Sequence, residues 1–266
     1  MINVIERKVE GKHNMETCED AIVLTPHFVA VIDGSTSKTT FRHYHGASNG
    51  RMAMTIIKNY IEREAEANMT IDSFCRGVTS YINQIYRVSQ NLRRMEQHPE
   101  ERLTASVAIY SCERKEVWMI GDCQAIVDQV YYNNDKPDEA VIAAKRSQLI
   151  KQGVAPSEAR RLIEPMLVRS VIGGQNKSYA VVDGFPVFMQ GVIVIPAHSE
   201  VVLATDGYPF LRSTLAESEE TLSQQLRKDP QNIETFLATK GIKEGNSSFD
   251  DRAFIGSPDK PRGKFL

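Results

Sequence analysis

The sequence of 266 residues lacks the features that mark membrane, secreted and nucleic-acid-binding proteins. Its apolar runs all fall far short of the roughly 18 residues that cross a bilayer, so we expect no membrane partner. Residues 1–8 alternate polar and apolar side chains without the apolar core of a signal peptide, and we therefore expect a cytoplasmic protein. The formal net charge is only −2, which argues against a nucleic-acid partner.

Cysteine is scarce and its spacing is wrong for a metal site. The four cysteines form no Cys-x-x-Cys pair, so we expect reduced, packed thiols rather than a zinc or redox centre. Low-complexity tracts and linkers are missing, and no repeat exceeds the recurring Asp-Gly dipeptide. We therefore predict a single domain over residues 1–266, with a helical insertion at 133–175 and a tail at 257–266. No stretch marks an obvious dimer surface.

One stretch that is present stands out, a run of five apolar residues that ends in Asp33-Gly34. A continuous apolar run of this length is typical of a strand buried on both faces. Residues 201–207 repeat the pattern and end in Asp206-Gly207. Glu19 and Asp20 begin the strand that precedes Asp33, and a short turn between the two strands predicts a hairpin. The hairpin would bring three carboxylates to one edge.

Helical periodicity alternates with short strand patterns along the rest of the chain. We predict helices at 48–64 and from 71 to about 94, each with a buried stripe at i, i+3, i+4 spacing. Shorter helices are expected at 140–151, 158–166, 217–227 and 233–239. Strands are expected at 3–10, 103–110, 116–120, 125–130, 192–195, 201–204 and around 251–255. Asp183-Gly184 lies between two apolar runs and predicts a hairpin turn, with a ligand role as the alternative.

Acidic residues recur at the predicted strand ends and turns. Oxygen ligands without His or Cys select hard cations such as Mg²⁺ or Mn²⁺. Two such ions about 3.5–4 Å apart would share a bridging carboxylate and activate a water molecule for attack on phosphorus. Each Asp-Gly taken alone is most often a plain turn, and the order and placement of several such sites along the chain favour the ligand interpretation. The candidate ligands are Glu19, Asp20, Asp33, Asp122, Asp206 and Asp250, with Asp251 as a further candidate.

In their order along the chain, these motifs resemble the metal-dependent Ser/Thr protein phosphatases of the 2C type. The resemblance covers nearly the full length and implies an α+β fold, a four-layer αββα sandwich of two antiparallel sheets flanked by helices. The matching segments are Glu19-Asp20-Ala21, Phe28 to Gly34, Leu103 to Ala108, Trp118 to Asp122, Gln148 to Ala159, Arg169 to Gly173, Val202 to Gly207 and Phe249 to Asp251.

The resemblance also implies roles for individual residues. Asp33 would bridge two metal ions, Mg²⁺ or Mn²⁺, and the Gly34 carbonyl would bind one of them. Asp206 and Asp250 would complete the first site. Glu19 would hold the second ion directly or through water, with Asp20 behind it. Asp122 would help Asp206 to hold a third, weaker ion.

Three positions depart from the family pattern. The family's phosphate-binding Arg is Met15 here, so Lys12 or His13 would have to donate to phosphate, without the bidentate fork of Arg. Its candidate acid after the first Asp-Gly is Ser35, which leaves His43 or His45 as general acid. Its Gly-Asp-Ser-Arg strand ends in Gln124, without the basic residue.

The sequence thus favours an enzyme that hydrolyses phosphoserine or phosphothreonine in phosphorylated proteins, with Asp33 and Asp206 at its centre. Two alternatives remain open at this stage. One is a regulatory or binding module that keeps the fold with weak or no catalysis, which the three departures favour. The other is a small-molecule phosphohydrolase on the same core.

Overall fold

Two antiparallel five-stranded sheets form the centre of the molecule. The computed structural model describes residue 4 and residues 6–257. One sheet contains, in spatial order, β1 (Glu6–Glu10), β10 (Arg252–Ser257), β9 (Val201–Ala204), β6 (Gln124–Val127) and β7 (Val130–Tyr132). The other contains β2 (Asp20–Leu24), β3 (Phe28–Gly34), β4 (Ala105–Ser111), β5 (Glu116–Ile120) and β8 (Val192–Pro196).

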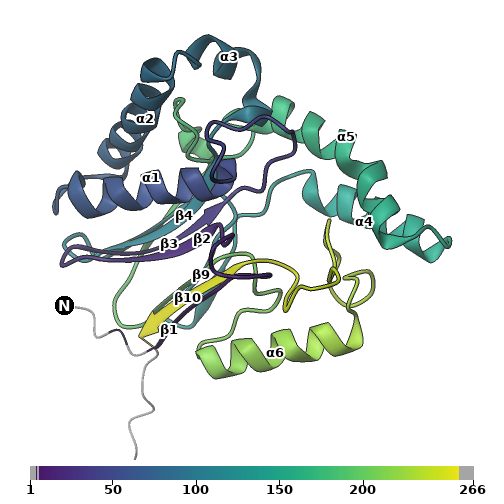
Figure 1. Ribbon diagram of the computed structural model, residues 1–266. Helices are drawn as coiled ribbons and strands as arrows, with labels where there is room; N and C mark the ends of the chain where they lie inside the picture. Colours follow the sequence, from purple (N-terminus) through teal and green to yellow (C-terminus); the bar gives the residue numbers. More distant parts are fainter. Residues whose placement is uncertain (1–3, 5, 258–266) are drawn as a thin grey trace, which may run out of the picture.

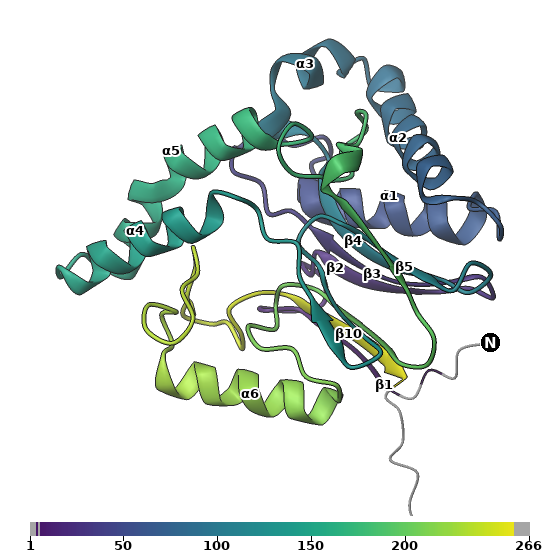
Figure 2. The same ribbon diagram turned by 180° about the vertical axis from the view of Figure 1, so that it is seen from behind.

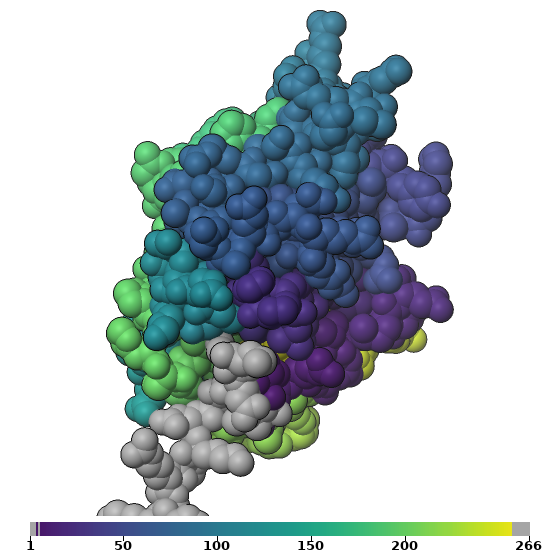
Figure 3. All heavy atoms as spheres, turned by 90° about the vertical axis from the view of Figure 1, so that its left-hand side faces the viewer, coloured from purple at the N-terminus to yellow at the C-terminus, as the bar shows by residue number. Residues whose placement is uncertain are grey.

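Helices cover the outer faces of both sheets. Figure 1 shows α1 (Asn49–Arg63) and α2 (Ile71–Val88) over the β2–β8 sheet, and α6 (Leu215–Lys228) beneath the β1–β7 sheet. In the side view of Figure 3, the blue side chains of the α1–α2 region lie above the purple N-terminal strands. The predicted α+β fold, a four-layer αββα sandwich, is therefore confirmed.

A helical segment extends beyond one end of the sheets. It contains α4 (Glu139–Lys151) and α5 (Pro156–Gly174), and Figures 1 and 2 both show it projecting past the strands. Both helices fall within residues 133–175, and the assignment of this segment as an insertion stays a prediction. Within the described ranges, none of the helices combines the length and apolar character needed to span a bilayer.

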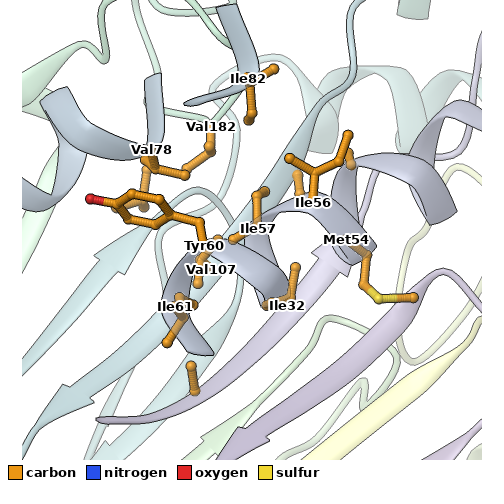
Figure 4. Close-up of a cluster of buried hydrophobic side chains, with 14 of the residues drawn as sticks. Ile32, Met54, Ile56, Ile57, Tyr60, Ile61, Val78, Ile82, Val107 and Val182 are labelled. Atoms are coloured by element: carbon orange, nitrogen blue, oxygen red, sulfur yellow. The ribbon is translucent and has the colours of Figure 1, made fainter. Parts of the chain in front are cut away.

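The apolar run of β3 is buried because each of its faces packs against a different layer. Ala30 and Ile32 point toward α1 and α2, where Figure 4 shows Ile32 beside Ile57 and other side chains of those helices. Val29 and Val31 point into the space between the two sheets. Strand β9 repeats this arrangement between the opposite sheet and α6. A strand in this position needs apolar residues at every position, which explains the runs that end in Asp-Gly.

Helices α1 and α2 begin where the sequence predicts, but α2 ends earlier than predicted. Ser48 and Thr70 are the N-caps of α1 and α2, and each side chain accepts a hydrogen bond from a backbone N–H of the first turn. The second helix ends at Val88 rather than near residue 94. Gln90 then adopts a left-handed φ of 57°, and a separate short helix, α3 (Leu92–Gln97), follows.

Two local predictions are wrong for reasons of turn chemistry. The strand predicted at 125–130 is two strands, because Asp128 and Gln129 both have positive φ (49° and 71°) and close a tight hairpin. The helix predicted at 233–239 is a loop. The Asp229 carboxylate accepts hydrogen bonds from the backbone N–H groups of Ile233, Glu234 and Thr235, and holds the loop in place of helical bonds.

The Asp183-Gly184 hairpin is also absent. The preceding run forms two isolated bridges, from Val182 to Ala105 and from Tyr179 to Gln175, in place of a hairpin ladder. Asp183 is fully buried and accepts hydrogen bonds from Arg102 and Gln175, so its carboxylate is used inside the protein. The tail predicted from residue 257 lies outside the described residues, except for Ser257 at the end of β10. Likewise, the described part of the first strand begins at Glu6.

We predict that Gly34→Ala destabilises the fold, because Gly34 lies against the N-terminal turn of α1. A Cβ at Gly34 would come 2.3 Å from the carbonyl oxygen of Gly50. We expect a loss of about 1–3 kcal/mol in the free energy of unfolding, measured by urea denaturation. Gly173→Ala is the matched control, since a Cβ at this position in α5 meets nothing within 4 Å. It should leave stability unchanged or raise it, and equal losses in both variants would contradict the prediction.

Candidate active site

A pocket opens at the end of the sandwich where β3 and β9 end and β10 begins. Its wall includes Asp33 near the end of β3, Asp122 in the β5–β6 turn, Asp206 after β9 and Asp250 before β10. Asp20 begins β2 and pairs directly with Asp33 in the antiparallel register, so the predicted hairpin is confirmed. Both sheets therefore contribute carboxylates to the same end of the molecule.

Asp20, Asp33 and Asp206 lie close together, and the protonation of Asp20 and of Asp33 responds to the neighbouring charges. Burial raises the pKa of Asp33 well above its usual range, and the charges of Asp206 and Asp20 raise it further. Burial also raises the pKa of Asp20, against the opposing effect of a hydrogen bond from Thr205. Asp20 Oδ2 is buried and has no hydrogen-bond partner within the described part of the chain. This group of acids therefore carries electrostatic repulsion that its own hydrogen bonds do not relieve.

Asp122 is held by two fixed donors. Gly121 has a φ of 92°, and a Cβ there would lie 2.2 Å from the Ser106 hydroxyl, so the turn before Asp122 requires glycine. The Ser106 hydroxyl donates to Asp122 Oδ1 at 2.5 Å, and the Lys136 ammonium pairs with Oδ2. Burial alone would raise the pKa of Asp122, but the charge and hydrogen bond of Lys136 outweigh it and lower the pKa.

Lys12 joins the N-terminal segment to the start of β10. Its ammonium lies 2.8 Å from Asp250 Oδ1, 3.1 Å from Asp251 Oδ2 and 3.9 Å from Glu19 Oε2. Asp251 also accepts the backbone N–H groups of Lys12 and Glu19, so it fixes this segment rather than facing the pocket. The second oxygen of Asp250 pairs with Lys240. Asp250 thus lines the pocket with a cation at each oxygen.

Glu19 and Gly34 lie behind the pocket wall. The Glu19 carboxylate accepts hydrogen bonds from the hydroxyls of Thr36 and Ser48, both at 2.6 Å, which ties it to the N-cap of α1. Gly34 donates its N–H to the Glu19 carbonyl at 3.0 Å. Neither residue is among those that line the described pocket.

The predicted histidines lie elsewhere. His43 packs against Phe41 and Tyr86, and its Nε2 lies 3.0 Å from the carbonyl oxygen of Glu101. His45 is exposed, as is His13, whose Nδ1 lies 3.1 Å from the Gly245 carbonyl oxygen. Of the residues that line the described pocket, none is a histidine. Lys12 does line it, with its ammonium directed at the carboxylates described above.

Several pocket residues carried no recognisable sequence signal. Lys38, Lys136, Arg160 and Lys240 line the pocket from four separate segments, and no motif connects them. Gln124 is a different case, because it stands where the family pattern has Arg. Its buried amide donates to the carbonyl oxygens of Thr205 and Tyr208, at 3.1 and 2.9 Å, and so fixes the loop that carries Asp206.

The carboxylate oxygens of this pocket are the type of donor that a hard divalent cation prefers, but in the described part of the chain they do not form a compact set of ligands. Carboxylate oxygens dominate the acidic side of the pocket, and the buried, unpartnered oxygen of Asp20 points to a missing positive partner. Among the described residues, no group of three or more His, Cys, Asp or Glu side chains has the arrangement of a ready-made metal site. Lysine ammonium groups contact Asp122 and Asp250 instead.

Comparison with known proteins adds a fold-level result. No protein-family model and no curated protein matches the sequence. Several solved structures of Ser/Thr phosphatases resemble this chain. The catalytic domain of the phosphatase PstP, solved with two manganese ions, shares 13% identity over 95% of this chain and 96% of its own, with a TM-score of 0.49.

Two further similar structures are Stp1 from Staphylococcus aureus and RsbX in complex with magnesium. Stp1 shares 13% identity over 98% of this chain and 96% of its own, with a TM-score of 0.47. RsbX shares 13% identity over 96% and 98%, with a TM-score of 0.46. The resemblance expected from the motifs thus has a counterpart among solved structures, as a likeness of fold. The assignment of function below depends on the pocket residues.

We predict that Gln124→Leu destabilises the loop that holds Asp206. The substitution keeps the size of the side chain but leaves the buried carbonyls of Thr205 and Tyr208 without this donor. We expect a loss of about 2 kcal/mol in the free energy of unfolding, measured by urea denaturation. Gln148→Leu, on the exposed side of α4, is the control and should change stability by less than about 0.5 kcal/mol. A loss no greater than in the control would contradict a positioning role for Gln124.

Proposed function

We propose that this protein is a metal-dependent phosphatase that hydrolyses phosphoserine or phosphothreonine in proteins. The observation that carries the proposal is the meeting of Asp33, Asp122, Asp206 and Asp250, from both sheets, in one pocket that basic side chains also line. Acids that disturb one another's pKa at the bottom of a pocket are typical of a functional site. The order of the sequence motifs and the resemblance to Ser/Thr phosphatases support the choice of reaction.

Asp33 and Asp206 would be the main metal ligands, with Asp20, Asp122 and Asp250 beside them. Glu19 and the Gly34 carbonyl, behind the wall, complete the proposed set. Two or three Mg²⁺ or Mn²⁺ ions, when bound, would supply a water of lowered pKa and positive charge for the phosphate oxygens. Release of Asp250 from its contacts with Lys12 and Lys240 would make its oxygens available.

The chain's own residues would position these groups. Gln124 holds the loop of Asp206, and Ser106 fixes one oxygen of Asp122. Lys12 and Lys136, once freed from their carboxylates, would be donors for phosphate oxygens. No histidine lines the described pocket, so the proton for the leaving group would come from water or from a lysine of the wall rather than from His43 or His45.

A regulatory module with the same fold is the second candidate. One observation favours it: Met15, at the position of the family's phosphate-binding Arg, is exposed and its side chain offers no donor to a phosphate. Such a module would recognise a phosphorylated protein without turning it over.

The first test is hydrolysis of a generic aryl phosphate by the purified chain, with and without Mn²⁺. We expect activity that requires the metal and falls by about 100-fold or more in Asp33→Asn and in Asp206→Asn, because each removes a charged ligand worth several kcal/mol. Asp72→Asn is the control, since Asp72 is exposed on α2, away from the pocket.

The pattern of results separates the candidates. Loss in both pocket variants but not in Asp72→Asn supports the phosphatase. No turnover in the wild type, with Mn²⁺ binding visible by calorimetry, supports the regulatory module. Full activity in Asp33→Asn and Asp206→Asn would overturn the metal-centre proposal. It would show that these two residues serve only the turns after their strands and do not bind metal ions.

A further inference from the structure

One wall of the pocket is formed by basic side chains that come from loops and a helix and not from the two sheets. It contains Lys38 from the loop after β3, Lys136 from the loop before α4, Arg160 from α5 and Lys240 from the loop after α6. We call these four residues the basic wall. All four are half-buried, so their charges are only partly screened by water.

Two members of the basic wall have no acidic partner. Lys136 and Lys240 pair with Asp122 and Asp250. Lys38 donates to the Thr36 carbonyl at 2.5 Å, and Arg160 donates to the Thr239 carbonyl at 2.9 Å. Within the described ranges, neither forms an ion pair with a carboxylate. Glu139 also lines the pocket and offsets part of this charge, but it contacts neither residue as an ion pair.

The basic side chains are close enough to repel one another. Burial and, after it, the charges of Arg160, Lys240 and Lys136 together lower the pKa of Lys38 to about 7. Like charges gathered from four segments into one half-buried wall cost free energy unless an anion lies among them. Planar guanidinium and mobile ammonium groups are both established binders of phosphate and carboxylate oxygens.

We propose that Lys38 and Arg160, flanked by Lys136 and Lys240, bind a second anionic group of the substrate, beside the phosphate held at the carboxylates. The inference rests on the proposed function and adds the substrate class: phosphate esters with a neighbouring acidic group. That group is either an Asp, Glu or second phosphate in a phosphopeptide, or the second phosphate of a small bisphosphate. The basic wall thereby supplies the anion recognition that Met15 does not.

Binding is tested first, in metal-free buffer at fixed ionic strength, so that the result does not depend on turnover. Calorimetry compares inorganic phosphate with pyrophosphate on the full chain. We expect pyrophosphate to bind at least about 10-fold more tightly, and Lys38→Met/Arg160→Met to abolish that preference. The control, Arg93→Met/Lys145→Met, removes the same two charges from exposed positions outside the pocket and should keep it.

The second arm uses phosphopeptides with Mn²⁺. We compare kcat/KM for phosphoserine peptides that carry two Asp residues after the phosphoserine with kcat/KM for peptides that carry two Lys residues there. In parallel, we compare kcat/KM for a small-molecule bisphosphate with that for the corresponding monophosphate. We expect kcat/KM of the wild type to be about 10-fold or more higher for the Asp peptide than for the Lys peptide. In Lys38→Met/Arg160→Met the two values should be similar. A bisphosphate preference without any flank preference would identify the small ester as the source of the anion. Lys38→Met alone is included because the Lys38 ammonium donates to the exposed carbonyl oxygen of Thr36, so loss of this bond is expected to leave the fold intact.

The outcomes separate this inference from the proposed function. Equal affinity for phosphate and pyrophosphate, or a preference that survives Lys38→Met/Arg160→Met, would overturn the inference. Loss of the preference in the control as well would overturn it too, since net charge and not the wall would be responsible. Absence of all hydrolysis with intact pyrophosphate selectivity would refute the phosphatase while leaving the anion site supported.

Discussion

Mutual repulsion of carboxylates at one end of the two sheets is the constraint on which the rest of the site depends. Burial and the charge of the nearby Asp206 raise the pKa values of both Asp20 and Asp33. Such a group is stable only with positive charge close by. The lysines of the described structure pair with the acids around this group instead, Lys12 with Asp250 and Lys136 with Asp122.

The two signs of charge come from different parts of the fold. The acids stand on strand ends of the two sheets, where backbone pairing fixes them, as in the direct pairing of Asp20 with Asp33. The basic side chains come from the loops and helices around the end of the sandwich. A site built in this way has a rigid half suited to chemistry and a separate half suited to recognition.

The basic half is nevertheless held in place. Arg146 of α4 is almost fully buried and donates to the backbone and side-chain oxygens of Gln231, at 2.7 and 3.0 Å. Ser147 donates to the Ile233 carbonyl at 2.9 Å. These bonds tie the loop after α6 to the helical insertion. They explain why Arg160 and Lys240, which are 80 residues apart, line the same pocket.

Apolar patterning was the most informative part of the sequence. The runs before Asp33 and Asp206 predicted strands buried on both faces, because no amphipathic strand has apolar residues at every position. The helical periodicity similarly predicted α1 and α2, and the structure shows Ser48 and Thr70 as their N-caps. Predictions were wrong where single polar side chains or left-handed residues governed the backbone, as at Asp128-Gln129 and in the loop held by Asp229. Such bonds depend on neighbours that periodicity does not reveal.

The sequence by itself determined the strand ends that carry acids and the hairpin that brings Asp20 to Asp33, because these follow from local hydrophobic patterns and short turns. The four-layer arrangement was expected from the resemblance to a known family, since local patterns do not specify how two sheets stack. Only the tertiary structure decided that Gln124 supports the Asp206 loop, that His43 lies in an aromatic cluster, and that Lys38, Arg160 and Lys240 form one wall. Those contacts join segments far apart in the chain, and their geometry arises from packing rather than from any local pattern.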